Sequence, residues 1–249
     1  MNIVMKTALS TLLIVLSVSA VGAAQSGDAL PTTEDVVAQM MQLDKQRHAQ
    51  LPGYTATRHY LAVNKHRRAE MLVRVACASD GVKRFTIVSE DGSHYIRKHV
   101  FYKMLNEEAA ASGRDTREGT RITPANYDFQ VIGQEAVDGR PAYVLSVTPK
   151  AQNKYLIEGK IWVDAKDYSI VRIEGRPARN PSFWTRSVHF VHTYQKVGPF
   201  WLAASTDSVS EIRIFGAAEL TIENSGYTLN PPDIQTTDTD TDTEARLAQ

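Results

Sequence analysis

Residues 69–77 read Ala-Glu-Met-Leu-Val-Arg-Val-Ala-Cys and carry a clear strand pattern. Every second residue from the first alanine is apolar, while Glu70 and Arg74 fall on alternate positions. A period of two places these apolar side chains on one face of a β-strand. The dipeptides Asp80-Gly81 and Asp91-Gly92 follow this run and the next one, and such dipeptides are typical of hairpin turns. This part of the chain therefore predicts an antiparallel meander.

Similar short runs, separated by turn residues, lie on both sides of this stretch. The sequence predicts about ten or eleven strands in all. Besides residues 54–63 and 69–77, they are residues 83–89, 129–132, 142–147, 155–164, 169–174, 188–194, 200–205, 211–215 and 218–223. Short connections favour one antiparallel sheet that curls on itself over a parallel α/β fold. The predicted fold class is mainly β (α+β), in a single domain over residues 25–231.

Two segments break the strand pattern with helical spacing. The first follows Pro31, where Thr32 and Asp35 approximate a capping box, and it ends before Pro52. The second spans residues 96–111, and its apolar residues form one stripe: Ile96, Val100, Phe101, Met104 and Leu105. The concave face of the sheet is the simplest cover for that stripe. The inserted helix is either part of the core or a lid over an apolar cavity.

Both ends of the chain lie outside the predicted fold. Residues 1–24 show the order of a cleaved export signal, with one early positive charge, an apolar run and small residues. Cleavage is expected after Ala24, and a periplasmic location follows. The residue directly after this site is Gln25 and not a cysteine, so we expect no lipid anchor at the new N-terminus. Residues 232–249 are rich in Thr and Asp, and we expect a disordered acidic tail.

Composition excludes several function classes. Lys plus Arg equals Asp plus Glu, at 28 each among 249 residues, so bulk charge indicates no nucleic-acid partner. The single cysteine, Cys77, excludes an intramolecular disulfide. His189 and His192 would point to opposite faces of one strand, so they predict no metal site. Motifs such as Gly-x-Ser-x-Gly and His-Glu-x-x-His are missing from the sequence, and we expect no cofactor and no enzymatic activity.

A longer run suggests a family. Residues 153–164 read Asn-Lys-Tyr-Leu-Ile-Glu-Gly-Lys-Ile-Trp-Val-Asp and continue into Tyr-Ser-Ile-Val-Arg-Ile-Glu-Gly at residues 168–175. This run resembles a signature of the outer-membrane lipoprotein-sorting family, the LolA/LolB-like periplasmic carriers. Supporting matches are residues 126–129, 139–143, 180–184 and 200–202. The resemblance covers about residues 36–227, and its motifs are strand-and-turn patterns rather than catalytic signatures.

The resemblance implies an unclosed antiparallel barrel, a helical lid and a hydrophobic cavity that holds the acyl chains of a lipoprotein or lipid. It also implies an inner-membrane donor complex and an outer-membrane acceptor as partners, and no catalytic residue or metal. Phospholipid or another amphiphile fits the same cavity, so the cargo stays open. The rival function is that of the RseB/MucB envelope-stress sensors, in which a similar barrel senses lipids and holds a protein partner.

On the carrier interpretation, acyl chains enter between the sheet and the inserted helix. The sheet side of the cavity is predicted to comprise Tyr60, Met71, Val73 and Phe85, and the helix side is the stripe from Ile96 to Leu105. Arg58 shares a strand face with Tyr60, and we expect it to hold the lid closed through backbone carbonyls. Phe101→Asp is expected to abolish cargo binding while the β-rich fold persists.

Overall fold

The computed structural model describes residues 30–112, 118–183, 185–213 and 216–230. The expected export signal, residues 1–24, and the expected acidic tail, residues 232–249, lie outside this part of the chain. None of the described helices is long and apolar enough to cross a membrane.

The described residues contain ten strands, all in one sheet. The strands are β1 (Tyr54–Asn64), β2 (Arg68–Cys77), β3 (Lys83–Gly92), β4 (Tyr127–Val137), β5 (Arg140–Pro149), β6 (Ile157–Asp164), β7 (Ile170–Pro177), β8 (Thr185–Val197), β9 (Phe200–Ile212) and β10 (Gly216–Leu229). Their order across the sheet is β3-β2-β1-β10-β9-β8-β7-β6-β5-β4. Every neighbouring pair is antiparallel.

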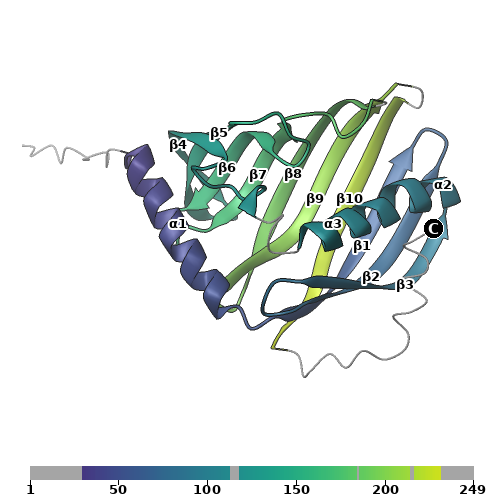
Figure 1. Cartoon of the computed structure of the whole chain (residues 1–249), viewed down its shortest axis with the longest axis horizontal. Coiled ribbons are helices and arrows are strands. Elements are labelled where there is room, and N and C mark those ends of the chain that lie inside the picture. The colour runs from purple at the N-terminus through teal and green to yellow at the C-terminus, as the bar shows by residue number, and fades with distance from the viewer. Residues whose placement is uncertain (1–29, 113–117, 184, 214–215, 231–249) are drawn as a thin grey trace, which may run out of the picture.

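The sheet is curved and not closed (Figure 1). The first and last strands meet in its interior, where Tyr60 of β1 lies opposite Ile222 of β10. The two edges are β3 and β4, and the inserted helix lies on the connection between them. The mainly β, unclosed antiparallel architecture with an N-terminal and an inserted helix is therefore confirmed.

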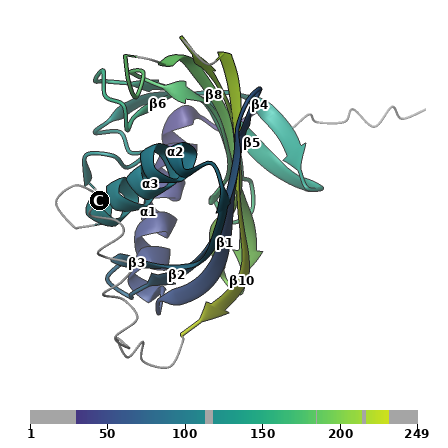
Figure 2. The ribbon, with the colours of Figure 1, turned by 90° about the vertical axis from the view of Figure 1, so that its right-hand side faces the viewer.

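Two helical segments lie on the same side of the sheet (Figure 2). Helix α1 (Thr33–Gln50) begins where the Thr32 hydroxyl accepts a hydrogen bond from the backbone N–H of Asp35. The inserted segment runs without a break through α2 (His94–Ile96), the π-helical turn η1 (Arg97–Phe101) and α3 (Tyr102–Ala111). Turns of π-helix inside α-helices are often found at functional sites. This one makes the inserted segment a structural candidate for function.

The strand boundaries correct the sequence-based prediction in two places. Residues 200–205 and 211–215 were expected to be separate strands, but β9 is continuous from Phe200 to Ile212. Its polar middle is held by pairing with β8 and β10 on its two sides. Tyr155 was expected in a strand, but it precedes β6, and its N–H donates to the Asn153 side chain in a turn.

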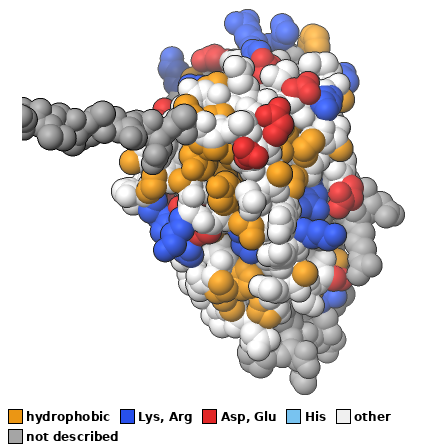
Figure 3. All heavy atoms as spheres, turned by 90° about the vertical axis from the view of Figure 1, so that its left-hand side faces the viewer, with side chains coloured by type: hydrophobic (Ala, Val, Ile, Leu, Met, Phe, Trp, Pro, Cys, Tyr) orange, Lys and Arg blue, Asp and Glu red, His pale blue; other side chains and the backbone are white. Residues whose placement is uncertain are grey.

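The two largest hydrophobic clusters each contain one of the helical segments, and two smaller clusters are built from strand residues alone. One cluster packs α2, η1 and α3 against β1–β3 and β10, and a second packs α1 against β4–β7. On the face of the molecule beside α1 and β4, described hydrophobic side chains lie in separate groups between charged ones (Figure 3). The concave side of the sheet, between the two helical segments, is the other place where an apolar binding surface could lie.

Candidate functional site

The inserted helix is packed tightly on one half of the concave face. Phe101 and Leu105 have no exposed surface, and the Phe101 ring lies 5.4 Å from that of Tyr60. The residues predicted to line a cavity all belong to this one cluster. Buried members are Tyr60, Met71, Val73, Phe85, Ile96, Phe101 and Leu105, and partly buried ones are Val100 and Met104. In this closed arrangement they form packed core, so any cavity among them requires the helix to move.

A charged network joins the inserted helix to the sheet. Arg58 of β1 donates to the Glu108 carboxylate of α3 at 2.6 and 3.3 Å, and Lys83 of β3 donates to the same carboxylate at 2.7 Å. Arg58 is buried and also donates to Asn224 and to the Tyr60 hydroxyl. The expected contact of Arg58 with backbone carbonyls is thus corrected: its partner on the helix is a carboxylate side chain.

The pKa of the Glu108 carboxyl is set by burial and by its two cationic neighbours. Burial alone would raise its pKa, but the positive charges of Lys83 and Arg58 outweigh burial and lower the pKa from 4.5 to about 2. The carboxylate is therefore ionised at every pH at which the protein is expected to work. Its hydrogen bonds with both cations are charge-assisted, which makes them stronger than neutral ones.

Two further contacts hold the inserted segment at its ends. At the N-terminal end, Arg97 of η1 pairs with Glu90 of β3 at 2.6 Å. At the C-terminal end, Glu107 of α3 pairs with Lys154, in the loop between β5 and β6, at 2.8 Å. These polar contacts add to the apolar packing of Phe101 and Leu105 on the sheet, and outward movement of the segment would have to break both.

The strip of sheet between the two helices is incompletely covered. No residue of β8 is fully buried, whereas every second residue along most of β1 is. A pocket of about 250 Å³ opens here on the concave face, and its walls are mostly apolar or aromatic. The lining residues are Thr120, Ile122, Tyr127, Tyr155, Ile157, Ile173, Phe190, His192 and Thr206. We call this the central pocket.

One titratable side chain lies in the wall of the central pocket. His192 forms a hydrogen bond with the Thr206 hydroxyl on the neighbouring strand. Burial lowers its pKa to about 4, and the charges of Arg58 and Lys83 add to this effect. The ring is therefore neutral near pH 7 and compatible with an apolar occupant. His189, by contrast, is exposed and lies 3.6 Å from Glu174.

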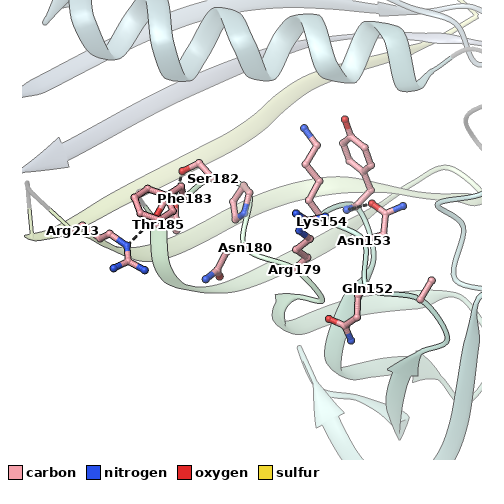
Figure 4. A pocket seen from close by; sticks show the side chains of 12 residues that line it. Gln152, Asn153, Lys154, Arg179, Asn180, Ser182, Phe183, Thr185 and Arg213 are labelled. Carbon is pink, nitrogen blue, oxygen red and sulfur yellow. Dashed lines mark hydrogen bonds between the residues drawn. The ribbon is translucent and has the colours of Figure 1, made fainter.

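A second hollow, of about 880 Å³, lies at the rim of the sheet (Figure 4). It is bordered by residues 151–155, residues 179–183, Thr185 and Arg213. We call this the rim hollow. Tyr155 lines both the rim hollow and the central pocket, so the two spaces are neighbours that share one side chain.

Sequence reasoning missed the central pocket, the rim hollow and Glu108. A signal for Glu108 was present, because it follows Leu105 by three residues and so continues the apolar stripe of the helix. A carboxylate on the apolar face of a helix is costly to bury unless a cation pairs with it. Arg58 was predicted to share the inward face of β1 with Tyr60. The central pocket had no such signal, since its walls come from strands distant in sequence.

The sequence matches no protein-family model and no protein with a curated description. Similar solved structures include a DUF1329 family protein from Desulfovibrio piger (12% identity, TM-score 0.44, covering 87% of this chain and 99% of that one). They also include a LolA superfamily protein from Nitrosomonas europaea (11%, 0.40, 84% and 99%) and a chain of the Pseudomonas aeruginosa MucA/MucB complex (11%, 0.28, 76% and 93%). The groups that the sequence motifs resemble are thus represented among these structures.

Proposed function

We propose that the chain is a periplasmic carrier that holds the acyl chain of a lipid or lipoprotein on the concave face of its sheet. The observation that carries this proposal is the central pocket, an apolar and half-covered strip between the two helical segments. The inserted segment beside it is held by apolar packing and by polar contacts. An acyl chain in water gains about 0.8 kcal/mol for each CH₂ group that it buries. The mature domain is proposed to span residues 25–231, after removal of an export signal.

The volume of the central pocket limits how much of an acyl chain it holds while the inserted helix is closed. Ligand pockets for small molecules are typically about 300–1,000 Å³, so the 250 Å³ of the central pocket holds only part of a long acyl chain. Outward movement of α3 would extend the pocket under Phe101 and Leu105, which face the sheet in the closed state. That movement would break the contacts of Arg58 and Lys83 with Glu108. An inner-membrane donor and an outer-membrane acceptor would be the partners of such a carrier.

The proposal is tested by filling the central pocket. Thr206→Phe puts a large side chain into it, and Val209→Phe adds the same ring to the same strand at an exposed position on the opposite face. Binding of a fluorescent 16-carbon fatty acid is measured for both variants after circular dichroism has established that they fold. We expect Thr206→Phe to weaken binding at least tenfold and Val209→Phe to leave it unchanged. Equal binding by all three proteins would contradict the proposal.

Movement of the helix is tested with a reversible tether. The variant Lys83→Cys/Glu108→Cys, in a Cys77→Ala background, is bridged by a bismaleimide with a cleavable linker. The carrier function predicts slower uptake of the fatty acid in the bridged protein and recovery after the linker is cleaved. Unchanged uptake would make the helix a permanent part of the core. A protein-binding regulator that takes up no fatty acid would fail both tests.

A further inference from the structure

We infer that the ligand of this chain carries an anionic phosphate headgroup, which occupies the rim hollow while the acyl chain lies in the central pocket. This inference rests on the proposed acyl-chain function and names its ligand class. It combines three observations: the charge of the rim hollow, the lack of described ion-pair partners for two of its cations, and the side chain that it shares with the central pocket.

All the charged residues that line the rim hollow are cations. Lys154, Arg179 and Arg213 border it, and its described lining residues include neither Asp nor Glu. Figure 4 shows that Lys154 and Arg179 belong to two neighbouring loops, with Arg213 on the far side of the hollow. Cations spread around a concave space raise the local concentration of anions. The guanidinium fork of arginine also matches the oxygens of a phosphate.

Two of the three cations are available for a ligand. Among the described residues, neither Arg179 nor Arg213 forms an ion pair, and both are exposed. The guanidinium of Arg213 is held in place by one hydrogen bond from its Nε to the Phe183 carbonyl, and it lies 4.9 Å from the Phe183 ring. That contact orients the side chain, and no carboxylate among the described residues compensates its positive charge.

The rim hollow and the central pocket meet at Tyr155. This residue is 44% exposed and lines both spaces, and the Lys154 ammonium lies 4.6 Å from its ring. A single amphiphile could therefore place its acyl chain on the apolar side of Tyr155 and its headgroup on the cationic side. A ligand with no negative charge would leave these cations unused.

Lys154 also connects the headgroup site with the inserted helix. Its ammonium pairs with Glu107 of α3 at 2.8 Å in the closed state. A phosphate in the rim hollow competes with Glu107 for Lys154, so headgroup binding would release one of the contacts that hold the helix down. Headgroup recognition and access to the acyl-chain site are thereby coupled.

The test compares two lysophospholipids with the same 16-carbon chain, lysophosphatidylglycerol and lysophosphatidylcholine, by titration calorimetry below their micelle concentrations. Both contain a phosphate, but only the first has a net negative charge. We expect the wild-type protein to prefer the anionic lipid by about five- to tenfold at low salt, and less at high salt, where exposed charges are screened. Arg179→Gln/Arg213→Gln should reduce the preference below about twofold, because it weakens binding of the anionic lipid more than binding of the zwitterionic one.

The matched control is Arg74→Gln/Arg84→Gln, which removes the same charge from exposed positions on β2 and β3 and should keep the preference. Equal affinity of the wild-type protein for the two lipids would overturn the inference and leave the carrier function standing. Inorganic phosphate that binds as tightly as the anionic lipid would also overturn it, because the site would then recognise a free anion. Binding of neither lipid would overturn the carrier function itself.

Discussion

Arg58 on β1 and Glu108 on α3 join the sheet to the inserted helix through two hydrogen bonds, 2.6 and 3.3 Å long. Buried ion pairs add little net stability compared with apolar residues of the same size. If the helix were permanently packed, an apolar contact at this place would therefore stabilise the protein as well as the ion pair does. A helix that opens into water benefits from charges, because both partners are readily hydrated once they separate. The pair fits a closure better than a fixed part of the core.

Replacing Glu108 should destabilise the closed protein. Glu108→Gln leaves the buried Arg58 without its counter-ion, and removing one partner of a buried pair costs about 3–5 kcal/mol. Glu108 is itself 31% exposed, so we expect a loss of about 2–3 kcal/mol in the free energy of unfolding. Urea denaturation at pH 7 measures this loss. Glu107→Gln, at the pair with Lys154 in which neither partner is buried as Arg58 is, should lose less than about 1 kcal/mol. Equal losses for both variants would contradict the network described here.

Stability should fall as the pH is lowered from 7 to 4. The pKa of His192 is about 4 in the folded protein against an ordinary value of 6.5, so the unfolded chain binds a proton first and stability is lost across that interval. Glu108 adds a loss between 4.5 and about 2, because its folded pKa is also the lower one. Urea midpoints at pH 7.5 and 5 measure the first effect. His192→Gln should reduce it and His189→Gln should retain it; no difference between them would refute this assignment.

Phe101 should behave as a core residue in the absence of ligand. It has no exposed surface, so Phe101→Ala is expected to lower the free energy of unfolding by about 3–5 kcal/mol. Phe101→Asp buries a charge in addition and should unfold the domain, which makes it unsuitable as a test of cargo binding alone. Phe183→Ala, at a ring that is 75% exposed, should change stability by less than about 0.5 kcal/mol. A much smaller loss of unfolding free energy for Phe101→Ala would contradict the tight packing of the helix on the sheet.

Two glycines allow β6 and β7 to approach closely. Gly159 lies opposite Gly175, and a Cβ at Gly159 would lie 2.1 Å from the backbone oxygen of Glu174. Gly159→Ala must therefore push the strands apart, and we expect a loss of at least about 2 kcal/mol, measured by thermal unfolding. Gly133→Ala is the matched control on β4, where a Cβ would meet no atom within 4 Å. Similar melting temperatures for both variants would contradict the close approach.

Much of the fold was predictable because it is local. Alternation along residues 69–77 identified a strand, and the helical stripe from Ile96 to Leu105 identified the inserted helix, since both periods follow from backbone geometry. The pairing of β1 with β10 was not predictable, because it joins segments far apart in sequence. The continuity of β9 through its polar middle was not predictable for a related reason: its strand conformation depends on neighbours on both sides.

The candidate site was predictable only in its packed part. The expected cavity residues on β1–β3 and on the helix do come together, because strand parity and helical stripe both point them inward. The half-covered strip at β8 depends on where α1 and α3 end on the sheet, which no local pattern encodes. The cations of the rim hollow come from separate loops, and loop positions follow from the finished fold.

The most direct measurement of the central claim is native mass spectrometry of the protein released gently from the periplasm, followed by organic extraction. The carrier function predicts a discrete added mass that disappears on extraction, together with an acylated molecule in the extract. Thr206→Phe, prepared in the same way, should lack that mass, while Val209→Phe should retain it. A protein that is free of ligand in every gentle preparation, and that takes up no lysophospholipid afterwards, would contradict the account.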